Sequence, residues 1–515
     1  MPDKSTPLLP DAQPIRIQQH SGRFSTGMLD KVEHLIVVLP DKTATEVWGQ
    51  CPDGARIREL RAKRKAGDLV SSRLRNPANT GISAGFIKGF ESSGKAAARF
   101  EQLSFVGKLA AAARAENPAS IALLVIGFQP EHATALYEAL ILAVNAHFFS
   151  LPAFNQKSSD KPRLRGIKLV GIDKRLRLER IVAESGAINL ARWLTALPPN
   201  KLDARGYRKC VESLAKQHGW KNEFLDEKKL ARQGAGAFLA VAQGNAGRDA
   251  GIVHLRYRPK GTGKTAPLLS LIGKGIIFDT GGTNLKPFKA MLDMHCDMAG
   301  SAVALATLVA LTEIAYPHPV DCWLAITENR LSNKAYKSRD VVTASNGTTI
   351  EVIHTDAEGR MALADTLALA GRQKPKAMID FATLTGSCVT ALTDRYSGAF
   401  SNRHDLVNTL IEAGAQSGER VWPFPMDKDF DDDLKSTAAD VLQCAAAGGG
   451  DHIQAARFLQ RFVPSESNWV HIDLSAATRT GGLAQVPTEI TGFGVRYALN
   501  LILDQHDALI ATKDD

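Results

Sequence analysis

Short apolar runs alternate with helical patterns along the first third of the chain. Three aliphatic runs predict buried strands at residues 34–40, 121–128 and 167–172. Two longer segments with apolar residues at helical spacing predict helices at 95–116 and 132–149. This alternation is typical of an α/β domain. We therefore predict an N-terminal α/β domain over residues 26–172, preceded by a Pro-rich, polar and flexible tail at 1–25.

The rest of the chain repeats the α/β pattern with longer apolar runs. A helical pattern that stops at Pro198 and Pro199 predicts a linker helix within 173–199. Five apolar runs then predict strands at 267–279, 321–327, 349–355, 377–384 and 468–475. Strands without polar alternation are typical of a mostly parallel sheet with helices on both faces. We predict that residues 200–515 form this second domain, with helices that include 299–314 and 360–370.

Composition narrows the class of protein. With 44% hydrophobic and 23% charged residues, the 515-residue chain has the balance of an ordinary globular protein. Its six cysteines contain no C-x-x-C pair, which argues against a disulfide framework or a thiolate zinc site and fits a reducing cytosol. We find no apolar run of signal-peptide length at the start and no later run of about 18 unbroken apolar residues. We expect a soluble, cytoplasmic protein without a membrane partner.

The formal net charge of +9 is compatible with a nucleic-acid partner. The densest basic segment covers residues 55–75. It has no interleaved aromatic residues, no zinc-finger spacing and no RNA-binding signature. A solvated helix face is the simpler interpretation, and a DNA-binding or architectural role stays open as the alternative.

Polar residues interrupt the apolar pattern where predicted strands end. Lys274 lies inside an apolar strand, where an ammonium group is costly to bury, and Asp279 follows before a Gly-Gly turn. Lys286 comes in the next loop, and Asp297 lies just ahead of a long apolar helix. Each residue alone has a structural explanation, as a snorkelling lysine, a turn aspartate or a helix N-cap.

A further predicted strand runs into Asp356, Glu358 and Arg360 within five residues, just before a helix. In an extended chain the side chains of Asp356 and Glu358 share one side, so both carboxylates can reach one metal centre. Favourable interaction with the helix dipole explains Glu358 alone but not the three charged residues together.

Ligands in open α/β sheets collect at the carboxyl ends of the strands, so four carboxylates and two lysines converge on one edge. Divalent cations make such a cluster tolerable, and oxygen ligands with an amine suit Zn, Mn, Mg or Co. Two ions about 3.5 to 4 Å apart bridge an activated water in hydrolases. The spacing therefore predicts a two-metal hydrolase, and phosphatases and nucleases fit it as well as peptidases do.

The segment around these residues resembles the signature N-T-D-A-E-G-R-L of the leucyl (cytosol) aminopeptidase family. That signature corresponds to residues 354–361, with His354 in place of Asn and Met361 in place of Leu. The similarity continues in collinear order over most of residues 189–500. It implies a metalloaminopeptidase that removes the N-terminal residue of peptides by attack of a metal-bridging water.

The resemblance also implies a role for each candidate residue. The tighter of two divalent ions would be held by Lys274, Asp279, Asp297 and Glu358, and the more exchangeable ion by Asp279, Asp356 and Glu358, so that Asp279 and Glu358 are shared. Zinc and manganese are the ions expected first, with magnesium and cobalt as alternatives. Lys286 would bind the substrate carbonyl and stabilise the oxyanion, and Arg360 would hold a bicarbonate that acts as general base. Met294, Thr383 and Leu384 match positions that line the substrate pocket. The resemblance also implies a homohexamer with its active sites facing an inner cavity, which would exclude folded proteins. The partners it implies are peptide substrates with a free N-terminus.

Overall fold

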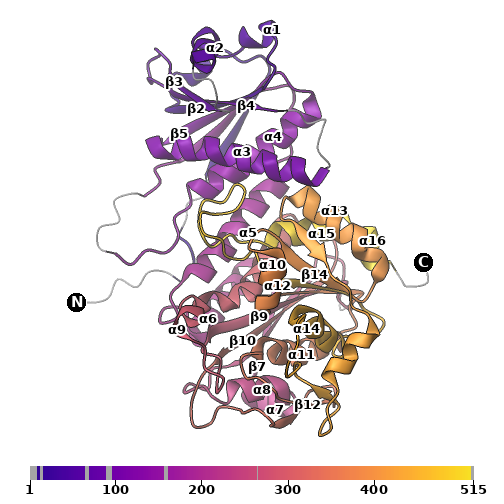
Figure 1. Ribbon diagram of the computed structural model, residues 1–515. Helices are drawn as coiled ribbons and strands as arrows, with labels where there is room; N and C mark the ends of the chain where they lie inside the picture. Colours follow the sequence, from indigo (N-terminus) through magenta and orange to yellow (C-terminus); the bar gives the residue numbers. More distant parts are fainter. Residues whose placement is uncertain are drawn as a thin grey trace. The chain divides into compact units, whose positions relative to one another are not determined.

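The computed structural model describes residues 8–11, 15–63, 69–88, 95–155, 161–263 and 265–511 (Figure 1). Contacts divide the chain into two compact units. The larger unit contains Met1–Pro10, Gly186–Arg479 and Ile490–Asp515, and the smaller contains Asp11–Ser185 and Thr480–Glu489. The division between Ser185 and Gly186 falls inside helix α5 (Glu179–Ala196), within the segment predicted as a linker helix.

The smaller unit is a six-stranded sheet with helices. Across the sheet the strands are β1 (Arg16–Ser21), β6 (Gly166–Ile172), β5 (Ser120–Val125), β2 (His34–Pro40), β4 (Gly81–Ile87) and β3 (Leu69–Arg73). Every neighbouring pair is parallel except β3 and β4. Its helices are η1 (Thr26–Leu29), α1 (Thr45–Trp48), α2 (Gly54–Lys63), α3 (Lys95–Glu116) and α4 (Pro130–His147). The predicted strands and helices of this unit are confirmed to within a few residues.

The predicted tail at 1–25 needs a correction. Residues 1–7 and 12–14 lie outside the described part, but Arg16–Ser21 form strand β1, which pairs in parallel with β6. The strand lies at the edge of the sheet and its side chains alternate between partly buried and exposed. A polar sequence such as RIQQHS fits this position because an edge strand is held chiefly by backbone hydrogen bonds and needs little apolar surface.

The predicted basic segment 55–75 spans α2 and β3, with residues 64–68 outside the described part. Ion pairs join its cations to nearby carboxylates: Arg56 and Lys63 to Glu59, and Arg61 to Asp41. Exposed pairs of this kind are typical of a solvated helix face. Local carboxylates therefore offset part of the charge that suggested nucleic-acid binding.

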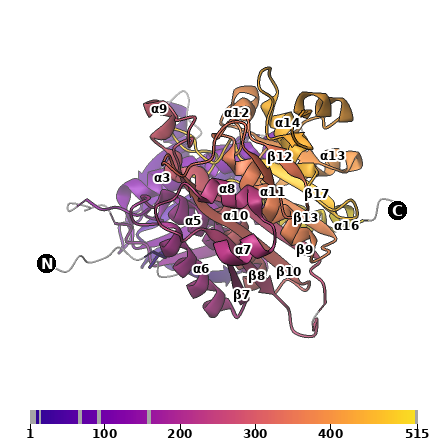
Figure 2. The ribbon, with the colours of Figure 1, turned by 90° about the horizontal axis from the view of Figure 1, so that it is seen from below.

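The larger unit is built on an eight-stranded sheet (Figure 2). In order across the sheet the strands are β15 (Val421–Pro423), β14 (Ser397–Ser401), β17 (Asn468–Asp473), β13 (Ala377–Ala382), β9 (Leu269–Asp279), β10 (Val320–Asn329), β8 (Gly251–Tyr257) and β7 (Lys221–Asp226). The central four, from β17 to β10, are parallel. The predicted mostly parallel α/β sheet is confirmed, with antiparallel pairs only toward its edges.

Helices pack on both faces of this sheet, and further helices pack on those. After α5, the helices of the larger unit are α6 (Ala204–His218), α7 (Glu227–Arg232), α8 (Gly236–Ala242), α9 (Phe288–Met291), η2 (Met294–Met298), α10 (Ala299–Glu313), α11 (Glu358–Gly371), α12 (Gly386–Leu392), η3 (His404–Leu406), α13 (Val407–Ser417), η4 (Lys428–Leu434), α14 (Asp451–Gln460), α15 (Val495–Asp504) and α16 (His506–Ile510). Consecutive residues of β9 face opposite sides, so α10 packs over Gly273 and α11 over Lys274. A Cβ at Gly273 would lie 2.3 Å from the Cα of Ser301, so glycine there lets α10 approach the strand.

The segment Met294–Glu313 is long and apolar enough to cross a membrane by length and composition alone, and 89% of its most apolar window is buried in the fold. It packs on β9, β10, β13 and α15. Burial of residues 299–311 explains the apolar sequence of α10, as in a core helix.

The strand predicted at 349–355 is shorter than expected. Only Thr349–Glu351 is extended, as β12, in a small separate sheet with β11 (Val341–Thr343) and β16 (Val441–Leu442). Ile350 and Val352 fill the core, which explains the apolar pattern. Beyond them the backbone turns, because Thr355 bonds to a different loop through its N–H and hydroxyl groups.

Candidate functional site

The candidate site residues come from adjacent elements of the larger unit. Strand β9 carries Lys274 and ends at Asp279, and the loop that follows carries Lys286. Asp297 lies in η2, and Glu358 is the first residue of α11. Both η2 and α11 pack on β9. The side chains therefore gather at the carboxyl ends of the parallel strands, the edge at which ligands bind in open α/β sheets.

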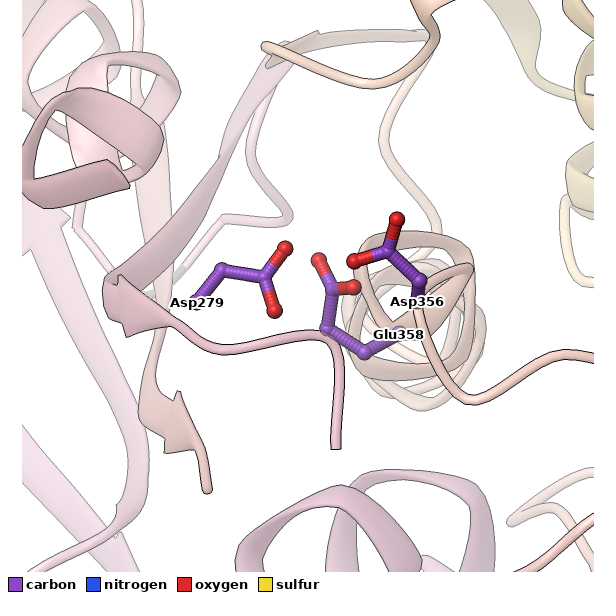
Figure 3. A group of neighbouring side chains, drawn as sticks. All are labelled: Asp279, Asp356 and Glu358. Carbon is purple, nitrogen blue, oxygen red and sulfur yellow. The ribbon is translucent and has the colours of Figure 1, made fainter. Parts of the chain in front are cut away.

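Three carboxylates form the centre of the site. Ligand oxygens of Asp279, Asp356 and Glu358 all lie within 4.8 Å of one another (Figure 3). Figure 3 shows the three side chains turned toward one another, with Glu358 at the start of α11 and Asp356 in the turn just before it. Asp279 and Glu358 are buried, and Asp356 is partly exposed. The pairing expected for Asp356 and Glu358 is present, although the chain there is a turn and not a strand.

Lys274 joins a fourth carboxylate to this centre. Its Nζ lies 2.9 Å from both Asp297 Oδ1 and Glu358 Oε1, and it donates a hydrogen bond to the Thr383 carbonyl at 2.9 Å. Only 3% of the residue is exposed. A Cβ on Gly359 would come within 2.6 Å of this Nζ, so the glycine of the motif leaves the room that Lys274 fills.

Lys286 lies on the other side of the cluster. Its Nζ is 2.9 Å from Asp279 Oδ2 and 2.6 Å from Asp356 Oδ1. The loop that brings it back turns at Gly281, whose φ of +83° favours glycine and where a Cβ would lie 2.4 Å from the Asn284 carbonyl oxygen. The Gly-Gly turn thus folds the chain so that Lys286 faces the carboxylates.

The electrostatics of the site are governed by burial. Burial, with repulsion from Asp279, raises the pKa of Glu358 to about 8. Burial raises the pKa of Asp297 to about 6, although Lys274 opposes the rise. Burial alone lowers the pKa of Lys274, but attraction to Asp297, Glu358 and Asp279 outweighs it and raises that pKa.

The donor set fits divalent metal ions. Asp297 Oδ2 is buried and accepts no hydrogen bond from the described residues, which leaves it free to act as a ligand. Four carboxylates and one amine supply hard oxygen donors and a nitrogen, the donor types that zinc and manganese accept. The ammonium groups of Lys274 and Lys286 offset part of the carboxylate charge.

Metal affinity is expected to rise with pH between about 6 and 8. Below its pKa of about 8, the Glu358 carboxyl holds a proton in the metal-free protein, and a metal must displace it. Competition between protons and metal gives about a tenfold change in affinity per pH unit for each proton displaced. Titration calorimetry of manganese or zinc into metal-free protein, in buffers of different ionisation enthalpy, counts those protons. Affinity that is flat over this range contradicts the prediction.

Asn329 is a site residue that the sequence analysis missed. As the last residue of β10 it donates from Nδ2 to Asp279 Oδ1 at 2.8 Å, to the Thr355 carbonyl at 3.0 Å and, more weakly, to Glu358 Oε2 at 3.4 Å. These bonds fix two carboxylates and the turn between β12 and α11. The available signal was a polar residue at the end of an apolar strand next to β9.

Of the residues predicted to line the substrate pocket, Thr383 contacts a carboxylate of the cluster. The Thr383 hydroxyl donates to Asp297 Oδ1 at 2.6 Å, so this side chain also orients a candidate ligand. The Leu384 N–H donates to Asp473 Oδ1 at 3.0 Å, which fixes the loop after β13. Met294 begins η2 and is partly buried, as is Leu384.

Arg360 is buried in the first turn of α11. Its Nη1 donates to the Gln443 carbonyl at 3.2 Å, and its Nη2 donates to both Asp451 oxygens at 2.8 Å. The group expected to hold a bicarbonate is thus bound to a carboxylate of the chain. Asp451 is the second site residue that the sequence analysis missed.

His354, which stands in place of the Asn of the family signature, is exposed. Its Nδ1 accepts a hydrogen bond from the backbone N–H of Asp356 at 3.3 Å, and the backbone N–H of His354 donates to Gln443 Oε1 at 3.1 Å. The imidazole therefore contacts the backbone that presents Asp356.

Comparisons with known proteins identify the family of the chain. Residues 189–499 match the model of the cytosol aminopeptidase family, catalytic domain, and this range contains all the candidate site residues. The probable cytosol aminopeptidase of Parasynechococcus marenigrum is 35% identical over 93% of this chain and 99% of its own. A mutant of tomato leucine aminopeptidase has a similar structure, with a TM-score of 0.82, 26% identity, and coverage of 97% of this chain and 99% of its own.

The bottromycin maturation enzyme BotP, solved in complex with Mn, has a TM-score of 0.78 and 26% identity, over 92% of this chain and 99% of its own. The family match covers more than half of the chain, and the curated relative covers almost all of it. The chain belongs to the cytosol aminopeptidase family, whose catalytic domain forms its larger unit.

Proposed function

We propose that the cluster at the carboxyl edge of the larger sheet is the active site of a two-metal aminopeptidase. The chain is a metalloaminopeptidase by family, and the convergence of four carboxylates and two lysines supports this location for the chemistry. The proposed ligands are Lys274, Asp279, Asp297, Asp356 and Glu358, with Asp279 and Glu358 shared by both ions.

When bound, the two cations polarise the scissile carbonyl and activate a water for attack. The chain's own residues position the reactants. Lys286 places a positive charge beside Asp279 and Asp356, where it can stabilise the oxyanion that develops on the substrate. Thr383 and Asn329 hold Asp297 and Asp279 in place through hydrogen bonds. Met294 and Leu384 offer apolar surface to the side chain of the N-terminal residue.

Zinc and manganese are the metals that we propose first, with magnesium and cobalt as alternatives. The donor set suits all four, and the manganese complex of BotP supports manganese. Bicarbonate fits less well, because Asp451 already binds the guanidinium that was expected to hold it.

We also propose a cytoplasmic homohexamer that acts on peptides with a free N-terminus. The family resemblance and the cytosolic names of the relatives support this proposal. Residues 200–515 would then be the catalytic domain, with 26–172 as an accessory domain and 173–199 as the helix between them. No comparison supports the DNA-binding alternative, and the basic segment 55–75 is partly paired with carboxylates.

Peptides with a free N-terminus are expected to be cleaved, and their N-acetylated forms to resist cleavage. Acetylation removes the amine lone pair that would bind a metal and adds bulk at the end of the substrate. The experiment compares matched peptides with metal-free enzyme reconstituted separately with zinc, manganese, cobalt or magnesium. Equal rates on blocked and free peptides would exclude an aminopeptidase. Inactivity with every metal and every free peptide would exclude the proposed site chemistry.

A further inference from the structure

The ion pair between Arg360 and Asp451 lies beside the proposed metal ligands. Arg360 follows Glu358 by two residues in the first turn of α11, and 1% of it is exposed. Both oxygens of Asp451 accept from Nη2 at 2.8 Å. A buried guanidinium is costly without a counterion, and the Asp451 carboxylate supplies that counterion.

The chain holds Asp451 in place from two directions. It is the first residue of α14, directly after Gly450, whose φ of +77° turns the chain into the helix. The next residue, His452, is tied to Ser387. Its Nδ1 shares a hydrogen bond with the Ser387 hydroxyl at 3.0 Å, and its backbone N–H donates to the same oxygen at 2.9 Å. The carboxylate is therefore presented to Arg360 by fixed backbone and not by a mobile loop tip.

Other contacts leave little room on the guanidinium for a second anion. Nη1 donates to the Gln443 carbonyl, and Gln443 is itself fixed by a bond from its Nε2 to the Ala357 carbonyl at 3.0 Å. Nε is closed to solvent and has no acceptor among the described residues. The opening to solvent lies on the Asp451 side, since that side chain is 45% exposed.

We infer that Asp451 is a built-in anion that takes the place on Arg360 which the family resemblance gives to an external bicarbonate. The enzyme therefore neither binds nor needs bicarbonate at this position. This inference rests on the proposed function for its relevance to catalysis, but the binding statement stands on the ion pair alone. Removal of Asp451 would leave an uncompensated buried cation two residues from Glu358, which opposes the binding of divalent metals and creates a vacant anion site.

The test measures bicarbonate binding to metal-free protein by titration calorimetry. Wild-type protein should show no binding at this site, and Asp451→Gly should gain it, because the substitution opens the space beside the guanidinium. With metal restored, Asp451→Gly should lose about 100-fold or more in turnover, the scale for loss of a positioned catalytic-site charge, and regain at least about tenfold on addition of bicarbonate. Wild-type turnover should not change with bicarbonate.

Asp431→Gly is the matched control, because Asp431 also accepts two hydrogen bonds from an arginine of α14, Arg457. It should gain neither bicarbonate binding nor stimulation. Bicarbonate binding or stimulation in the wild type overturns the inference, and this measurement does not depend on any variant folding. A folded Asp451→Gly that binds no bicarbonate also overturns it. A wild-type enzyme inactive on all peptides would refute the proposed function while the calorimetry still decides the role of Asp451.

Discussion

Replacement of Glu358 by alanine is expected to abolish peptide hydrolysis and to weaken metal binding at both positions. Glu358 lies within 4.8 Å of Asp279 and Asp356 through its carboxylate and 2.9 Å from Lys274, so its oxygens face both halves of the cluster. Loss of a partner outside the ligand set costs metalloproteins about 10-fold to 100-fold in affinity or activity. Loss of a ligand shared by two metals should therefore lower both metal affinity and activity by more than about 100-fold. Metal content after dialysis and turnover at saturating peptide measure the two losses.

Asp356→Ala provides the first comparison, since Asp356 is partly exposed and contacts Lys286 but not Lys274. It should empty mainly the more exchangeable position and leave one metal bound. Glu351→Ala is the control for a general loss of structure, because Glu351 is buried in the same unit and pairs with Arg339 away from the cluster. It should keep both metals even if it is less stable. Two metals retained in Glu358→Ala would rule out the shared role.

The sequence pattern predicts those parts of the fold that depend on local periodicity. Continuous apolar runs correctly place β2, β9, β13 and β17, because a strand buried on both faces has little polar alternation. Strand β1 cannot be recognised from apolar runs, since it is held by backbone pairing with β6 and its sequence is mostly polar. The strand expected at 349–355 is cut short by bonds from Thr355 to a loop about 70 residues away, which no local pattern encodes.

The same distinction applies to the site. Lys274 is conspicuous in sequence because a charged residue inside an apolar strand demands a buried partner, and Asp297 and Glu358 are those partners. Asn329 and Asp451 are not conspicuous, since an amide at the end of a strand and an aspartate after glycines are common where the chain turns. Their roles emerge only when β10 is placed beside β9 and α14 beside α11. The roles of these two residues thus depend on contacts between segments that are distant in the sequence.

Lys274→Arg is expected to lose the tighter metal and all measurable turnover, whereas Lys286→Arg should keep both metals and lose mainly turnover. To bind a metal, Lys274 must give up its proton and offer a nitrogen lone pair, although its carboxylate neighbours raise its pKa in the metal-free protein. Arginine stays protonated in proteins and cannot supply that lone pair. The larger guanidinium also has no space, because Gly359 packs directly against the Lys274 side chain.

Lys286 has a different task, since its ammonium group lies between Asp279 and Asp356 and acts as a cation. Burial works against its charge, but the carboxylates outweigh burial and raise its pKa, so it stays protonated at working pH. Another cation can partly replace it, and the expected loss in turnover is at most about 100-fold to 1000-fold, the range for one oxyanion donor. Metal content by mass spectrometry beside turnover separates the two variants. Lys289→Arg, an exposed change in helix α9 just beyond the loop of Lys286, should alter neither quantity. If Lys274→Arg retained two metals while Lys286→Arg lost one, the two lysines would have the opposite roles, and the assignment of ligands around β9 would have to be reversed.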